Sequence, residues 1–300
     1  MSEPRVPDVS PELPRAHWRA LLAALRRLPQ GALSRGFGAL ADAPIPRPLR
    51  RLVLSGFART LGIDLAEAEL PLAQYGSINA FFVRRLKAGL RAWPVAPATA
   101  GSPVDGVVGQ FGTISAGTLL QAKGRGYSAA RLLGDAEEAS RFQHGSYLTL
   151  YLSPRHYHRI HAPVAGAISK ARHVPGRLLP VNAPSVAHVP ELFAINERLV
   201  CYIDSALGRI AVVAVGAYNV GRIAAAFDAA WAAQGWVTNR RGAHPETRTY
   251  VPPVAVGTGA EIMAFHLGST VVLLLEPGVR LENSLRPGAE IRLGQAIASA

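Results

Sequence analysis

The residues most able to do chemistry are a serine, two histidines and an aspartate in separate stretches of the chain. Ser269 follows Gly268 in a short Leu-Gly-Ser-Thr segment. Because glycine has no Cβ, Gly268 can adopt backbone conformations closed to other residues and turn the Ser269 hydroxyl back against the preceding carbonyl. The same segment is also a common way to kink a strand, so on its own it leaves both interpretations open.

His158 and His161 stand three residues apart in a stretch rich in arginine and histidine. Imidazole exchanges protons readily near neutral pH, and a histidine paired with a carboxylate can activate a serine hydroxyl. Asp105 supplies a carboxylate, although Pro-x-Asp-Gly segments are often only turns. Asp105, His161 and Ser269 therefore have the types needed for an activated nucleophile. The chain has no Gly-x-Ser-x-Gly motif that would indicate an ordinary hydrolase.

A zinc site is the competing interpretation of His158 and His161. Their spacing supplies two ligands, and no third histidine or cysteine stands in a recognisable metal-binding context. A zinc-dependent hydrolase that uses these two histidines stays open as an alternative.

The elements that must position these residues are predicted to be mainly strands. Beyond Pro94, glycines and prolines separate short runs of Val, Ile and Leu, which predicts a β-rich core with tight turns. We expect an α+β fold in which N-terminal amphipathic helices precede a mostly antiparallel catalytic core over residues 96–300. The predicted strands are 106–109, 147–152, 165–168, 199–203, 209–215, 270–275 and 290–293. Ser77 is predicted to cap a helix over 78–86, a second helix spans 128–133, and a mobile loop spans 238–250.

The first 95 residues are predicted to form a disordered tail and a membrane-facing helical region. Apolar residues recur at helical spacing over 16–28 and over 48–61. Residues 1–60 carry ten arginines against four acidic residues, a net of +6, which is half of the chain's +12. One interpretation is docking onto an anionic bilayer; the other is a helix pair packed on its own core with a solvated basic face.

Composition excludes several classes of protein. A chain of 300 residues with 49% hydrophobic content can bury a substantial core. No apolar run approaches the ~20 residues that span a bilayer, and the N-terminus does not have the pattern of a secretory signal. The positive charge favours anionic partners, but no basic run has interleaved aromatics, so we expect no nucleic-acid partner. The single cysteine, Cys201, allows no internal disulfide and fits a reducing compartment.

Three motifs carry a family resemblance: Leu267–Thr270, Ser102–Gly106 and Ser153–His161. Together they resemble the phosphatidylserine decarboxylases of the bacterial, pyruvoyl-dependent type. His156 departs from the pattern, because the family usually has aspartate there, and we assign it no catalytic role. Further similar segments, in order and approximate spacing, are Phe81–Arg84, Gln121–Gly124, Val174–Gly176, Leu192–Arg198 and Val215–Ala217.

The resemblance implies a self-processing carboxy-lyase. The chain would cut itself between Gly268 and Ser269 into fragments 1–268 and 269–300, and Ser269 would become a pyruvoyl group, the covalent cofactor. Asp105 would orient His161, and His161 would activate the Ser269 hydroxyl. The pyruvoyl group would decarboxylate phosphatidylserine to phosphatidylethanolamine through a Schiff base, with His158 returning the proton.

The resemblance also implies partners and a location. The substrate would be phosphatidylserine in the bilayer. The two fragments of the cleaved chain would stay together, and two such proteins would form a homodimer. The protein would be held peripherally at the inner face of the cytoplasmic membrane, where the membrane surface is anionic. By charge alone, Arg155, Arg159 and Arg198 are candidates to hold the substrate's phosphodiester. The remaining alternative is a non-catalytic module that binds anionic lipid, which would leave the four chemistry-bearing residues unexplained.

Overall fold

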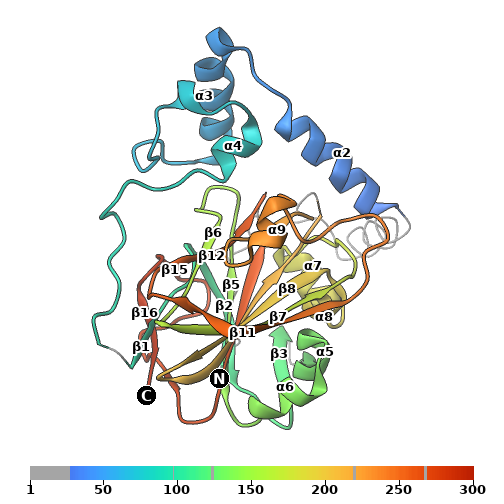
Figure 1. Cartoon of the computed structure of the whole chain (residues 1–300), viewed down its shortest axis with the longest axis vertical. Coiled ribbons are helices and arrows are strands. Elements are labelled where there is room, and N and C mark those ends of the chain that lie inside the picture. Colours follow the sequence, from blue (N-terminus) through green and yellow to red (C-terminus); the bar gives the residue numbers. More distant parts are fainter. Residues whose placement is uncertain (1–27, 97, 123–124, 219–220, 267–268) are drawn as a thin grey trace.

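The computed structural model describes residues 28–300, apart from residues 97, 123–124, 219–220 and 267–268 (Figure 1). The predicted tail and all but the last residue of the helix predicted over 16–28 lie outside the described residues, as does Gly268.

The fold is built on an eight-stranded sheet with the strand order β11-β7-β8-β9-β13-β5-β2-β15. Every neighbouring pair in it is antiparallel, which confirms the predicted arrangement. The strands, in chain order, are β2 (Gly106–Thr113), β5 (Ser146–Tyr151), β7 (Gly166–Val174), β8 (Arg198–Ser205), β9 (Gly208–Val215), β11 (Glu246–Val256), β13 (Thr270–Leu275) and β15 (Glu290–Ile291).

Both faces of this sheet are buried. Strand β13 shows why: its run of Val and Leu places Val271 and Leu273 in one hydrophobic cluster and Val272 and Leu274 in another. Because side chains alternate along a strand, a continuous apolar run is suited to a central strand covered on both sides.

Short helices cover one face of the sheet, in the cluster that includes Leu132 and Phe193. Their first turns are capped by side chains, as when Ser128 Oγ accepts from the amide of Arg131. The helices of this layer are α5 (Ala129–Leu133), α6 (Ala136–Arg141), α7 (Ala183–His188) and α8 (Leu192–Ile195), beside the hairpin of β3 (Thr118–Ala122) and β4 (Arg125–Ser128).

Two small sheets and one helix cover the other face, in the cluster that includes Ile160, Trp231 and Ile297. One small sheet has the order β10-β12-β6 and the other the order β1-β16-β14. Their strands are β1 (Thr99–Gly101), β6 (Arg159–His161), β10 (Ile223–Ala225), β12 (Glu261–Phe265), β14 (Arg280–Leu281) and β16 (Ala296–Ser299), and the helix is α9 (Ala229–Ala233).

The N-terminal helices stand at one end of the molecule, beyond the sheets (Figure 1). They are α2 (Gln30–Asp42), α3 (Arg50–Leu61) and α4 (Ile78–Phe82), with the 3-10 turns η1 (Arg47–Leu49) and η2 (Leu72–Gln74). Helix α3 confirms the prediction over 48–61, and Ser77 caps α4 as predicted, its Oγ accepting from the amide of Ala80. No helix in the described part of the chain is both long enough and apolar enough to cross a membrane.

Three predictions about the elements were wrong or incomplete. Helix α4 ends at Phe82 and does not reach residue 86. Residues 246–250, predicted as loop, belong to β11, where exposed side chains alternate with half-buried ones at the edge of the sheet. Helix α2 was not predicted, because its three glycines weaken helix propensity. The division into regions 1–95 and 96–300 stays a prediction.

Candidate functional site

Two backbone hydrogen bonds bring the Ser269 segment against the histidine segment. The amide of Leu152 donates to the carbonyl of Ser269 at 2.8 Å, just beyond the paired strands β5 and β13. The amide of Phe265, the last residue of β12, donates to the carbonyl of His158 at 2.9 Å. The chain between Leu152 and His158 is therefore tied at one end to Ser269 and at the other end to Phe265.

Ser269 is completely buried and lies directly before β13. Its hydroxyl has no hydrogen-bond partner among the described residues. A buried hydroxyl without a partner is unfavourable, and a catalytic role is one of the reasons for which a protein keeps such a group. Gly268, the other half of the predicted cleavage site, lies outside the described residues.

His158 is also completely buried, and its surroundings define its tautomer. Nδ1 lies 2.8 Å from the carbonyl of His156, which can only accept, so Nδ1 carries the proton. Nε2 is left with its lone pair, and no described residue bonds it. Burial lowers the pKa of His158 well below 6.5, so the imidazole is neutral at pH 7. The ring of Phe82, from α4, packs on it with centroids 4.1 Å apart.

His161 is held at both ring nitrogens. Nδ1 donates to the carbonyl of Gly259 at 2.7 Å, and the hydroxyl of Tyr157 lies 3.1 Å from Nε2, where it donates. Burial is the main cause that lowers the pKa of His161, which therefore also stays neutral at pH 7. The Tyr157 hydroxyl is thus bonded to Nε2, the nitrogen with which His161 would accept the proton of the Ser269 hydroxyl.

Asp105 is buried, but the structure does not place it in hydrogen-bond contact with His161. Its carboxylate accepts two bonds from Arg91 at 3.0 and 2.6 Å and one from the amide of Leu293 at 2.7 Å. It acts on His161 only through space, as the weakest of the causes that shift the pKa of that histidine. Arg91 also binds Glu67 at 3.0 and 2.8 Å, so it joins two carboxylates.

Three neighbours of the site were missed in the sequence: Phe82, Arg91 and Tyr157. Phe82 and Tyr157 lie inside segments that carried the family resemblance, which was the only signal for them. Arg91 had none, because its two carboxylate partners lie 14 and 24 residues away along the chain.

His156 performs a structural task. Its Nδ1 accepts a hydrogen bond from the amide of Ser153 at 2.9 Å, and its Nε2 lies 3.1 Å from the Glu290 carboxylate. An aspartate oxygen could accept the same amide, so histidine can take the place of the aspartate that the family resemblance led us to expect.

The three arginines considered for phosphodiester binding already have partners. Arg155 pairs with Glu290, and Arg159 binds Glu261 and donates to the carbonyl of Val83 at 2.9 Å. Arg198 is buried and donates to the backbone carbonyls of residues 131, 132 and 196. Arg159 and Arg198 are engaged inside the protein, whereas the Arg155 pair is exposed, and the role of these arginines stays a prediction.

The metal-site alternative gains no support from the geometry. Both His158 and His161 direct Nδ1 at a backbone carbonyl. Over the described ranges, no three histidine, cysteine or carboxylate side chains form a group that could hold a metal ion.

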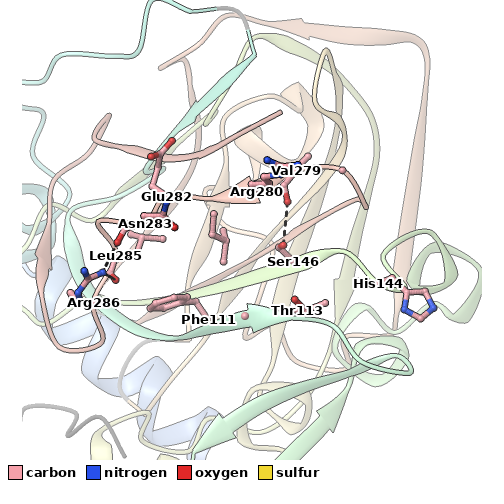
Figure 2. A pocket seen from close by; sticks show the side chains of 13 residues that line it. Phe111, Thr113, His144, Ser146, Val279, Arg280, Glu282, Asn283, Leu285 and Arg286 are labelled. Atoms are coloured by element: carbon pink, nitrogen blue, oxygen red, sulfur yellow. Dashed lines mark hydrogen bonds between the residues drawn. The ribbon is translucent and has the colours of Figure 1, made fainter. Parts of the chain in front are cut away.

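A surface hollow of about 660 Å³ lies elsewhere (Figure 2). Ser146, at the start of β5, donates to the carbonyl of Val279 at its wall. Ser269 accepts a backbone hydrogen bond from Leu152, just beyond the other end of β5. At ~3.3 Å per residue along the strand, Leu152 is about 20 Å from Ser146. The hollow is therefore distinct from the Ser269 site. It is lined by Phe111, Gly112, Thr113, His144, Ser146, Gly278, Val279, Arg280, Leu281, Glu282, Asn283, Leu285 and Arg286.

Comparisons with known proteins identify the family of the chain. A sequence model of the family described as phosphatidylserine decarboxylase matches residues 78–299. The chain is 48% identical to the phosphatidylserine decarboxylase proenzyme of Anaeromyxobacter sp. (strain K), over 94% of this chain and 99% of that protein. Proteins of the same name from Myxococcus xanthus and Azotobacter vinelandii are 41% and 43% identical, each over 98% of its own length. The chain therefore belongs to the phosphatidylserine decarboxylase family.

Proposed function

We propose that the chain cuts itself between Gly268 and Ser269 and uses the resulting pyruvoyl group to decarboxylate phosphatidylserine to phosphatidylethanolamine. The observation that carries this proposal is Ser269 itself, a fully buried serine whose hydroxyl no described residue bonds, tied by backbone hydrogen bonds to the segment that carries His158. Membership of the family supports the reaction and the self-processing.

The self-cleavage is an internal acyl shift followed by an elimination. The Ser269 oxygen attacks the Gly268 carbonyl, and the hydroxyl proton passes through an imidazole to the departing Ser269 nitrogen, which leaves an ester. Removal of the Ser269 α-proton then expels the Gly268 carboxylate. Residue 269 is then a dehydroalanine; water adds to its Cα and its nitrogen leaves as ammonia, which gives the pyruvoyl carbonyl. We assign the imidazole to His161, with Asp105 nearby, as the family resemblance implies; Tyr157 must then give up its place at Nε2.

The surroundings of Ser269 fit a pyruvoyl group. The hydroxyl is fully buried without a described partner, and the apolar ring of Phe82 packs on the buried His158. A pyruvoyl group supplies an electrophilic carbonyl that takes up the electron pair left when carbon dioxide departs, which side chains cannot do.

His158 is suited to move the protons of the decarboxylation. Its neutral Nε2 can take a proton from the substrate's ammonium group, so that the amine becomes a nucleophile. The same nitrogen can then return that proton to the α-carbon after carbon dioxide has left. The fixed Nδ1–H bond to the carbonyl of His156 keeps Nε2 as the reactive nitrogen throughout.

An intact-mass spectrum tests the proposal. We expect the purified protein to give fragments 1–268 and 269–300, the second beginning with pyruvoyl, and Ser269→Ala to remain one chain. Thr270→Val is the matched control, because it removes the adjacent buried hydroxyl that also has no described partner, and it should still cleave. An intact wild-type chain that releases carbon dioxide from phosphatidylserine would contradict the proposal.

We also propose that the N-terminal helices dock onto an anionic membrane. Helix α2 turns its small and polar side toward the protein and its apolar side outward. It buries Ser34 and Gly38 and exposes Leu33, Phe37 and Leu40. Leu49, Leu52 and Val53 are exposed at and after η1, beside the exposed Arg47 and Arg51. Apolar side chains flanked by arginine suit the headgroup boundary of an anionic bilayer.

Vesicle flotation tests the docking. We expect the wild type to float with vesicles of phosphatidylcholine and phosphatidylserine, and the triple variant Leu33→Ser, Phe37→Ser, Leu40→Ser to lose most of this binding. Leu120→Ser, an exposed leucine on β3, is the matched control. Equal flotation of the triple variant and the wild type would overturn the assignment.

A homodimer at the inner face of the cytoplasmic membrane completes the proposal, as the family resemblance implies. Light scattering of the purified protein should give twice the mass of the paired fragments. Protease added to intact cells should leave the protein whole, whereas protease added to inverted membrane vesicles should cut it.

A further inference from the structure

Arg84, two residues beyond the end of α4, is a buried arginine that pairs with no carboxylate among the described residues. The residue is only 3% exposed, and its Nε and Nη1 are enclosed without a hydrogen bond to any described residue. Its Cζ lies 5.4 Å from the centroid of the Phe81 ring. Because a buried charge is strongly unfavourable without a counter-charge, such a group is suited to an anion that arrives from outside the protein.

The carboxylates near Arg84 are already engaged. The charges of Glu67 and Asp105 act on it through space, but burial outweighs them and lowers the pKa of Arg84. Arg91 takes both carboxylates in direct bonds, two to each. The two arginines therefore have different roles. Arg91 neutralises the two carboxylates, and the positive charge of Arg84 is left for another anion.

Arg84 belongs to the surroundings of His158. Phe82, two residues before it, packs on the His158 ring. Burial is the main cause that lowers the pKa of His158, and the charge of Arg84 lowers it further. Tyr157, which bonds His161, also acts on Arg84 through space. The guanidinium and the two histidines therefore share one region of the protein.

We propose that Arg84 binds the phosphodiester of phosphatidylserine while the serine end of the headgroup reacts beside His158. The inference rests on the proposed function. One methylene and one ester oxygen separate the substrate's α-carbon from its phosphorus. When the α-carbon reacts beside His158, the phosphodiester must therefore lie close to His158 as well. A guanidinium donates N–H bonds to phosphate oxygens, and Nε and Nη1 of Arg84 are donors to which no described residue bonds.

The chemistry of decarboxylation favours the phosphodiester over the substrate's carboxylate. The carboxylate loses its charge as carbon dioxide departs, so an arginine bound there would stabilise the ground state more than the transition state. The phosphodiester keeps its charge throughout, and its binding leaves the chemical step unhindered.

Kinetics with a soluble short-chain phosphatidylserine test the assignment. We expect Arg84→Met to cleave itself normally and to raise KM about ten- to a hundredfold with little change in kcat, and Arg84→Lys to recover part of the affinity. Arg85→Met is the matched control, because the Arg85 side chain is 62% exposed and lies 3.7 Å from Glu261. An unchanged KM in Arg84→Met, or failure of that variant to cleave, would overturn the proposal.

A competitor identifies which anion is bound. Glycerophosphoethanolamine carries the phosphodiester and lacks the carboxylate. It should inhibit the wild type and raise its melting temperature, and both effects should vanish in Arg84→Met. Inhibition that persists in the variant would assign Arg84 to another group and overturn the inference. A wild type without pyruvoyl or carbon dioxide release would instead refute the proposed function, so the two failures are distinguishable.

Discussion

The Arg91 guanidinium binds the Asp105 carboxylate in two bonds, Nε to Oδ1 at 3.0 Å and Nη2 to Oδ2 at 2.6 Å. Asp105 comes from the motif predicted to serve catalysis, and its closest charged partner is this arginine. Together with Glu67, the pair ties the segment after α4 to the start of β2.

Breaking this pair should destabilise the protein. Arg91→Met leaves two largely buried carboxylates without their counter-charge, so the free energy of unfolding should fall by ~3 kcal/mol. Urea unfolding of the uncleavable Ser269→Ala background measures this. Arg155→Met is the control, because Arg155 and Glu290 are both more than half exposed and their pair should contribute less than ~1 kcal/mol.

The two histidines should separate cleavage from decarboxylation. We expect His158→Gln to cleave and to lose at least ~100-fold in carbon dioxide release, because Nε2 no longer moves the proton. His161→Ala should remain one chain. Mass spectrometry and carbon dioxide release on the same samples decide this, and normal cleavage of His161→Ala would remove His161 from the processing step.

Acid should destabilise the protein through His266. Burial, followed by the charge of Arg222, lowers the pKa of His266 to about 4. The unfolded chain binds this proton near pH 6.5, so the stability from His266 is full above that pH and is lost as the pH falls toward 4. The loss is ~3 kcal/mol at most, at ~1.4 kcal/mol per pKa unit.

Urea unfolding between pH 7 and 4.5 measures the effect of His266. The decline should be shallower in His266→Gln than in the wild type, whereas His244→Gln, at an exposed histidine, should follow the wild type. Equal slopes in all three proteins would contradict the prediction.

Two glycines in α2 should respond in opposite directions to the same substitution. A Cβ at Gly38 would lie 2.7 Å from Cζ of Arg222, whereas a Cβ at Gly36 would meet no atom within 4 Å. Gly36→Ala should therefore stabilise the protein by up to ~1 kcal/mol through helix propensity. Gly38→Ala should destabilise it, because Arg222 also pairs with Asp42 at the end of α2 and has little room to move. Melting temperatures of both variants check this.

The sequence by itself determined the central strands and the types of the reactive residues. Continuous apolar runs such as 270–275 indicate buried strands, and the motifs around Asp105, His158, His161 and Ser269 carried the family resemblance. Edge strand β11 and helix α2 escaped prediction, because polar alternation and glycine content conceal elements that tertiary contacts stabilise.

Only the tertiary structure decided which groups the reactive and charged side chains bind. The Nδ1 proton of His158, the Tyr157 hydroxyl on His161, and the division of roles between Arg84 and Arg91 depend on groups brought together by folding. The inner face of α2 is likewise defined by distant atoms: the amide of Leu178 donates to Gln30, and that of Gly221 to Ser34. Hydrophobic periodicity shows which side chains avoid water, but hydrogen-bond partners and buried charges depend on three-dimensional neighbours that no local pattern encodes.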